Sequence, residues 1–343
     1  MGKRNIIIAM FDSLPPRFVR QWGGDIDFLP KESLDTAFLL TRCYTAATIT
    51  IPSISSMFTG TYPMHHGVTS HWARFLSKLD PSTTTLAEVL KSNGYKTICG
   101  VPGKFKTVTY EAMGLSKGFD IGFNIVSSCK SREPMSNALE LTEPHVDGQP
   151  FFAWHHHFVT HIPYGYPAGY GGWLRYKWKC SISMEEACKR RIARTAELIV
   201  KPTYEFAKKH DAILLLISDH GEVFISETEG SHAEFLEEDN ARALCAFLGI
   251  DKGVNDELHS LVDLMPTILG LVGIESPPCD GVDAFRTGHE EVYCINEQTA
   301  GVKMSAVITK DAFKYSELQV ESRLRLEDEK KVLARLRALG YSE

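Results

Sequence analysis

The stretch NIIIAMFDS (Asn5–Ser13) decides the fold class, because it is a continuous apolar run that ends abruptly in a carboxylate. A strand that is apolar on both faces is typical of a parallel sheet covered by helices on both sides. Two later segments have the same texture, PFFAWHHHFV at 150–159 and DAILLLISDH at 211–220. The sequence therefore predicts central strands of one buried sheet in these three places.

Helical patterns alternate with these strands. Thr85 can cap an amphipathic helix that ends at Asn93-Gly94, and a further strand, YKTICGV, follows at 95–101. A long helical pattern from about Met184 to Lys209 precedes the last of the three apolar runs. This alternation predicts an α/β fold whose central sheet is mostly parallel and sandwiched by helices.

The texture changes after about Leu248. The segment HSLVDLMPTILGLVGI (259–274) predicts a helix, and RLEDEKKVLARLRALG predicts a second helix at the end of the chain. Between them, EEVYCINE, KMSAVITK and FKYSEL predict short strands. We therefore expect a catalytic α/β domain over residues 1–248 and a smaller C-terminal antiparallel α+β subdomain over 249–343, packed on the first.

Composition excludes several classes of partner. The 343 residues carry a formal net charge of −6, which gives no basic surface for nucleic acid. The longest apolar stretches, AILLLI and LMPTILGLVGI, are too short to cross a membrane, and the first residues do not resemble a signal peptide. The eight cysteines are scattered without a CxxC pair. We expect reduced thiols and a cytoplasmic protein without membrane insertion, compatible with a homo-oligomer.

Three polar residues follow directly after predicted strands. Asp12 ends the first strand, and Asp219 and His220 end a late one. Because parallel sheets place their chemistry at the carboxyl ends of strands, these residues are expected at one edge. Two carboxylates and an imidazole form a mixed oxygen and nitrogen set that suits zinc, manganese or another divalent ion.

The segment TITIPSISSMFTG (48–60) adds a hydroxyl to this set. Thr50 is an N-cap candidate, with Pro52 in the first turn of the helix that follows. A helix start attracts a phosphoryl or sulfuryl group, and a hydroxyl bound there to a divalent cation can act as a nucleophile. Taken alone, Thr50 favours the structural cap, and the nucleophile stays open as the second interpretation.

In combination, the segments resemble the sulfatase-like branch of the alkaline phosphatase/sulfatase superfamily. The matching segments run in order from residue 5 to the C-terminus: NIIIAMFDSLPPRFV, TITIPSISSMFTGTYPMHHGV, GYKTICGVPGKF, FFAWHHHFVTHIPYGYP, LLLISDHGE, SLVDLMPTILGLVGIESPPCDGVD and LRALGYSE. The resemblance implies an alkaline phosphatase-like fold. It also implies one firm metal site formed by Asp12, Thr50, Asp219 and His220, holding zinc or manganese, with calcium as the alternative.

The resemblance leaves a second metal open. Ser13 stands where many sulfatases carry another metal-binding aspartate. A second ion would need further ligands, for which His161 and His232 are the candidates. His157 is a weaker candidate, and Glu222 is the carboxylate left open. The remaining histidines of His155–His157 are interpreted as core or wall residues. Alternatively, His161 and His232 bind substrate oxygens or protonate the leaving group.

Three further residues are candidates for substrate binding. Lys104 in PGKF resembles the family's Gly-Lys, although a solvent-exposed lysine explains it nearly as well. Tyr164 belongs to the His-x-Pro-Tyr segment, and Arg175 lies in the aromatic and glycine-rich stretch GYPAGYGGWLRYKWK. That stretch fits a loop over a pocket and an ordinary surface loop equally well.

Departures from the family pattern bear on the reaction. Formylglycine sulfatases have Cys or Ser at the nucleophile position and an Arg four residues later, whereas this chain has Thr50 and Ile54. The resemblance then implies a metal-dependent hydrolase of small anionic phosphate esters, either phosphodiesters or phosphonate monoesters, through a covalent phospho-threonine. The alternatives are a sulfatase or sulfamidase without formylglycine, a phosphoryl-group transferase, and a non-catalytic ligand-binding protein.

Overall fold

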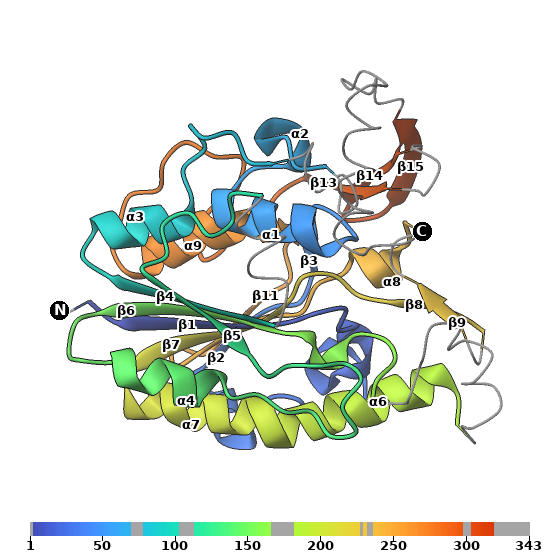
Figure 1. The fold of residues 1–343 in the computed structure, drawn as a ribbon. Coiled ribbons are helices and arrows are strands. Elements are labelled where there is room, and N and C mark those ends of the chain that lie inside the picture. Colours follow the sequence, from blue (N-terminus) through green and yellow to red (C-terminus); the bar gives the residue numbers. More distant parts are fainter. Residues whose placement is uncertain are drawn as a thin grey trace, which may run out of the picture.

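A computed structural model describes residues 3–69, 78–102, 113–165, 182–226, 229–231, 236–297 and 303–318. Its centre is an eight-stranded sheet in the order β11-β2-β10-β7-β1-β6-β4-β5 (Figure 1). The strands are β1 (Asn5–Phe11), β2 (Ala37–Leu40), β4 (Lys96–Pro102), β5 (Ile121–Ile125), β6 (Phe151–His157), β7 (Ala212–Ser218), β10 (Cys245–Leu248) and β11 (Gly253–Asn255). The strands predicted at 5–11, 95–101, 150–159 and 211–220 are thereby confirmed.

The sheet is mixed but mostly parallel. Strand β1 lies between β6 and β7 and runs parallel to both, while β10 is antiparallel to its two neighbours. All seven residues of β6 and of β7 are buried. This burial explains why the central strands show continuous apolar runs rather than alternation.

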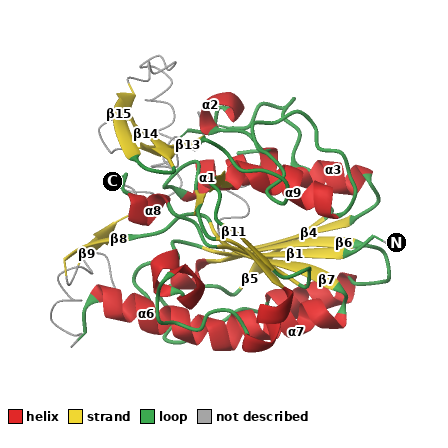
Figure 2. Cartoon of the chain, turned by 180° about the vertical axis from the view of Figure 1, so that it is seen from behind, coloured by secondary structure: helices red, strands yellow, loops and turns green. Residues whose placement is uncertain are grey.

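Helices cover both faces of the sheet, as the views from the front and from behind show (Figures 1 and 2). One layer contains α1 (Thr50–Thr59), α2 (Pro63–His66), α3 (Leu86–Ser92) and α9 (Leu264–Leu271). The opposite layer contains α4 (Ala138–Thr142), α6 (Met184–Thr195), a π-helical turn (Ala196–Val200) and α7 (Lys201–Lys209). Thr85 caps α3 in a capping box with Glu88, as its sequence predicts.

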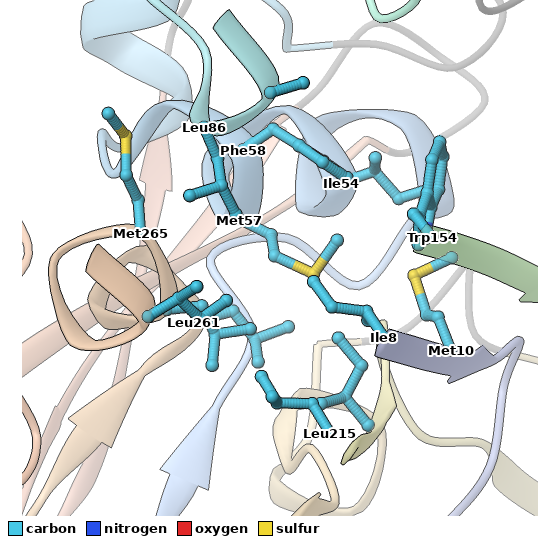
Figure 3. Close-up of a cluster of buried hydrophobic side chains, with 14 of the residues drawn as sticks. Ile8, Met10, Ile54, Met57, Phe58, Leu86, Trp154, Leu215, Leu261 and Met265 are labelled. Atoms are coloured by element: carbon cyan, nitrogen blue, oxygen red, sulfur yellow. The ribbon is translucent and has the colours of Figure 1, made fainter. Parts of the chain in front are cut away.

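The helix α1 is buried along its whole length, and its packing fixes the edge of the sheet beneath it. Met57 and Phe58 point into a core formed with Ile8 of β1 and Leu215 of β7 (Figure 3). The ring of Phe58 also packs edge-on against Trp154 of β6, with centroids 4.8 Å apart. Three central strands therefore contribute to the core that anchors α1 on this face of the sheet.

The C-terminal part adds a separate three-stranded antiparallel sheet. It is formed by β13 (Glu291–Glu297), β14 (Lys303–Thr309) and β15 (Phe313–Leu318). These strands match the three predicted segments, and the fold class is confirmed. The domain division at residue 248 stays a prediction. Two elements that follow that residue, β11 and α9, pack with the large sheet and with α1 respectively.

The remaining short elements are α8 (Glu238–Ala241) and two small sheets, β3 (Cys43–Tyr44) with β12 (His259–Ser260) and β8 (Val223–Ser226) with β9 (Glu229–Ser231). The continuous helix predicted over 259–274 is wrong at its start. There, β12 and a 3-10 turn (Leu261–Asp263) precede α9, since the Asp263 carboxylate accepts the Ser260 amide and ends the strand. The predicted C-terminal helix lies outside the described residues. No described helix has the length and apolar character that a membrane span requires.

Candidate metal and nucleophile site

Adjacent strands bring the predicted site residues together at one edge of the sheet. In the register of β1, Phe11 pairs with His157 of β6 and with Ser218 of β7. Asp12 and Asp219 each follow these paired residues directly, so they leave the sheet side by side. The Asp12 amide donates to the His157 carbonyl over 3.0 Å, which continues the sheet bonding by one residue.

Asp12, Asp219 and His156 form a buried group with metal-binding character. One ligand atom from each lies within 4.8 Å of the others, and all three side chains are buried. His156 Nε2 donates to Asp12 Oδ2 over 3.0 Å. Asp219 Oδ1 accepts the backbone amides of Ser13 and His220, each at 3.0 Å. The backbone therefore fixes one oxygen of Asp219 and leaves the other for a ligand.

The orientation of His220 supports the presence of a cation site. Its Nδ1 donates to the Gly221 carbonyl over 2.9 Å, so a neutral ring carries its lone pair on Nε2. That Nε2 lies 3.4 Å from Asp219 Oδ2, a buried oxygen without a hydrogen-bond donor within the described residues. Two buried acceptors that face each other are unfavourable unless a cation lies between them. These residues fit a divalent metal ion.

Thr50 lies at the same place. Its Oγ1 is 3.5 Å from Asp12 Oδ2 and 3.4 Å from His220 Nε2. The expectation that Thr50 is the N-cap of α1 is wrong: Ile49 occupies the cap position, Thr50 is the first helical residue, and no side chain caps the helix. The extended residue that precedes the helix is Ile49, so Thr50 already has a helical backbone and its hydroxyl lies near Asp12 and His220.

The pKa values of the two carboxylates are shifted in opposite directions. Burial alone would raise the pKa of Asp12, but the hydrogen bond from His156 and the charges of nearby histidines outweigh it and hold that pKa well below its usual range. Burial and the negative charge of Asp12 raise the pKa of Asp219. The two carboxylates therefore repel each other, as expected where a cation is shared.

His156 was missed by the sequence analysis, which interpreted this histidine as a core or wall residue. The alternation along β6 is as predicted, with His155 and His157 on one face and His156 on the other. The alternation of side chains along a strand could have found His156. It lies two and four residues after Trp154 and Phe152, so it shares their face of β6, which is the face toward α1. The weaker metal candidate His157 is wrong: it lies on the opposite face, stacked on Phe11 with ring centroids 5.2 Å apart.

His161 and Glu222 border the group. Burial alone would lower the pKa of His161, but a hydrogen bond with the Cys129 thiol and the charge of Asp12 raise it to about 10. The His161 Nδ1 donates to the Ile162 carbonyl over 2.7 Å. Glu222 is fully buried, and burial raises its pKa to about 8. Both residues thus lie close enough for the charges of Asp12 and its neighbours to affect their pKa values.

Of the predicted substrate-binding residues, the structure describes Tyr164. Its ring is buried, its backbone has a φ of 58°, and its amide donates to the His161 carbonyl over 3.2 Å. The candidates Lys104, Arg175 and His232 lie outside the described residues. Their roles remain predictions, as do those of Tyr164 and His161.

The sheet, the helix layers and the buried carboxylate–histidine group define an α/β protein of the alkaline phosphatase type. The model of the sulfatase family matches residues 4–274, so the chain belongs to the sulfatase family, a family of hydrolases. A comparison with curated proteins gives no match.

Solved structures show the same fold at low sequence identity. The 2-O GAG sulfatase BT1596 is 16% identical, with a TM-score of 0.72 over 98% of this chain and 91% of that chain. An alkaline phosphatase superfamily protein from Vibrio parahaemolyticus is 19% identical, with a TM-score of 0.65 over 99% and 86%. The lipoteichoic acid synthase LtaP from Listeria monocytogenes is 14% identical, with a TM-score of 0.62 over 98% and 92%.

Proposed function

We propose that the protein is a metal-dependent hydrolase of phosphate esters, acting on phosphodiesters or phosphonate monoesters through a covalent phospho-threonine. One observation carries the proposal: Thr50 Oγ1 lies 3.5 Å from Asp12 Oδ2 and 3.4 Å from His220 Nε2, beside the buried metal-binding group. A hydroxyl in this position can attack a phosphoryl group that is held at the start of α1.

The identity of two residues favours phosphoryl over sulfuryl chemistry. By resemblance, formylglycine sulfatases need Cys or Ser at position 50, and threonine cannot be converted to that aldehyde. Their arginine corresponds to Ile54, which is fully buried and packs near Trp154 and Phe58 beneath α1 (Figure 3). A charged side chain could not replace Ile54 without placing a charge in this apolar core.

Each residue of the site has its own role in the proposed reaction. Asp12, Asp219 and His220 would hold the ion, His156 orients Asp12, and a bound ion would stabilise negative charge on the phosphoryl oxygens. The Thr50 hydroxyl gives its proton to solvent, and its oxygen forms a bond to phosphorus while the bond to the leaving oxygen breaks. The leaving oxygen keeps the electron pair and takes a proton, for which we assign His161 as the donor. Water then attacks phosphorus, the Thr50–phosphorus bond breaks, and the hydroxyl is restored.

A second candidate function is sulfate-ester hydrolysis without formylglycine. Membership of the sulfatase family favours it, and one similar structure is named a 2-O GAG sulfatase. Transfer of a phosphoryl group to an acceptor alcohol would use the same residues, and one similar structure is named a lipoteichoic acid synthase. We further propose a small anionic ester as the substrate, zinc or manganese as the ion, and a cytoplasmic location.

The test compares wild type, Thr50→Ala and Thr97→Ala after the bound metal has been measured. Thr97 is a matched buried threonine at the amino end of β4, away from the site. Substrates are nitrophenyl phosphate, bis-nitrophenyl phosphate, a nitrophenyl phenylphosphonate and nitrophenyl sulfate. We expect metal-dependent turnover of the diester or phosphonate by wild type and Thr97→Ala, and a loss of about 10³-fold or more in Thr50→Ala, in line with other catalytic nucleophiles.

Peptide mass analysis of acid-quenched wild type should also find phosphate on Thr50. Full activity of Thr50→Ala would rule out the nucleophile assignment. Turnover of nitrophenyl sulfate alone would select the sulfatase alternative. Binding of these esters without turnover of any, in metal-loaded protein, would select the non-catalytic alternative.

A further inference from the structure

A cavity rich in arginine lies beside the loop that carries His161. It has a volume of about 400 Å³ and is bounded by α6, the segment 132–134 and the Tyr164-Gly165 turn. Four of its lining residues are arginines and one is a glutamate; with the rim carboxylates Glu186 and Glu197 included, one positive charge remains in excess, in a protein whose net charge is −6. The charged residues lining it are Arg132, Glu133, Arg190, Arg191 and Arg194.

The helix α6 builds one wall by its periodicity. Ala187, Arg190, Arg191 and Arg194 stand at intervals of three and four residues, so they share one face of the helix. The small side chain of Ala187 leaves space between the first turn and the arginines. The positive charge of this wall follows from the sequence of α6 and not from an accidental approach of distant residues.

Arg191 forms the buried base of the cavity. It is 3% exposed, and within the described residues each of its acceptors is a backbone carbonyl. Its Nε donates to the Val159 carbonyl over 2.7 Å, and its Nη2 donates to the Ser128 carbonyl over 2.9 Å. Carbonyl dipoles satisfy its donors but do not neutralise its charge, so an anion in the cavity would gain from it.

The rim arginines differ in their partners. Arg194 pairs with Glu133 over 2.9 Å and also with Glu197, while Arg190 pairs with Glu186 over 2.7 Å. Arg132 is exposed and has no ion pair within the described part of the chain. Arg132, an exposed guanidinium without an ion pair in that part of the chain, lies beside Arg191, which donates to the Arg132 carbonyl. Arg132 can therefore bind a phosphate or sulfate group with two parallel hydrogen bonds, while the charge of Arg191 attracts it.

The cavity is coupled to the catalytic edge through its walls. The Gly165 amide donates to the Cys129 carbonyl over 2.6 Å, and the Cys129 thiol is hydrogen-bonded to the side chain of His161. Arg191 binds the Val159 carbonyl, two residues before His161. The loop that carries His161 therefore also forms part of the cavity wall, and for this reason we look to the ester substrate as the source of the anion.

We propose that this cavity is a second anion subsite that binds a tetrahedral oxyanion, namely a further phosphate or sulfate group on the ester substrate. The proposal rests on the proposed function for the source of that group, but the binding itself does not depend on turnover. A free inorganic anion has the same chemistry, and the experiment separates the two sources.

The test compares wild type with the double variant Arg132→Ser/Arg190→Ser, which changes the two rim arginines and spares the buried Arg191. The control is Lys130→Ser, an exposed cation of the same segment that does not line the cavity. Calorimetric titration with inorganic sulfate and phosphate is done at constant ionic strength, since screening would otherwise mimic a loss of affinity. We expect wild type and Lys130→Ser to show a binding event that the double variant loses or weakens about tenfold or more.

Kinetics then assign the source of the anion. For esters that carry a second phosphate or sulfate, we expect KM to rise about tenfold or more in the double variant, with unchanged kinetics on bis-nitrophenyl phosphate. Identical sulfate and phosphate titrations for all three proteins would overturn the subsite. If the anion event is lost but KM for these esters is unchanged, the substrate source is wrong. If no ester is turned over, the proposed function fails while the titrations still decide the subsite.

Discussion

Replacing His156 with leucine should lower both the stability of the metal-free protein and its affinity for a divalent ion. His156 Nε2 donates to Asp12 Oδ2 over 3.0 Å, and both side chains are fully buried, so water cannot replace the lost donor. A hydrogen bond to a charged group contributes about 1.5–3 kcal/mol. In His156→Leu the nearest remaining partner of Asp12 Oδ2 is the Thr50 hydroxyl at 3.5 Å, which is too distant to compensate.

The expected loss in free energy of unfolding is therefore about 2 kcal/mol, measured by urea denaturation in the presence of a chelator. Metal affinity should fall about 10- to 100-fold, because His156 either binds the ion itself or orients the Asp12 carboxylate that does. Calorimetric titration of zinc and manganese into the metal-free protein measures this change. The His156→Gln variant keeps a donor at a similar distance and should recover part of both losses.

The matched control is His157→Leu, on the neighbouring residue but the opposite face of β6. Its ring stacks on Phe11, and its pKa is lowered well below the usual value because it is buried. Leucine there alters apolar packing and should leave metal affinity unchanged. The reasoning would be refuted if His156→Leu bound metal as tightly as wild type, or if both leucine variants lost affinity equally.

Two further predictions concern parts of the fold away from the site. Gly60 ends α1 with a φ of +66°, and a Cβ there would lie 2.9 Å from Cys279 Cβ, whereas Gly67 has a φ of +79° and open space. Gly67→Ala should cost about 1–2 kcal/mol for the backbone alone and Gly60→Ala clearly more, and equal losses on urea denaturation would contradict the steric argument. The hydrogen bond with Asp263 raises the pKa of His289 above 6.5, so its stabilisation is complete below pH 6.5 and is lost as pH rises through the raised value. In His289→Gln, the free energy of unfolding should therefore decrease less with rising pH than in wild type. An equal pH dependence in both proteins would show that His289 is not its source.

Much of the fold was predictable because burial leaves a strong local signal. The strands β1 and β7 are each seven residues long and mostly apolar on both faces, and β6 begins with a buried apolar run, so burial marks all three in the sequence. The order of the strands was not predictable in this way. The antiparallel β10 has only four residues, and its insertion between β7 and β2 depends on pairing between distant segments, which local sequence does not encode.

The candidate site was predictable where its residues follow strands, and it was missed where a residue of the buried group lies within a strand. Asp12 and Asp219 are the first residues after β1 and β7. Because parallel sheets carry their sites at the carboxyl ends of strands, the sequence alone indicates both residues. His156 is still inside β6, among three histidines whose sequence context is nearly the same. Only the register, which pairs Met10 with His156, places this ring beneath α1, and register is a property of two strands and not of one.

The position of Thr50, one residue into α1, changes what its hydroxyl can do. An N-cap hydroxyl is engaged by the amides of the first turn, and a threonine so engaged would aim its oxygen into the helix. Ile49 holds the cap position without a side-chain acceptor, although the helix start is buried, so the positive end of α1 is not satisfied by a cap. The Thr50 oxygen is free to face Asp12 and His220 instead. An anion placed there would complete the helix start and lie next to the hydroxyl, which is the arrangement that the proposed attack by Thr50 requires.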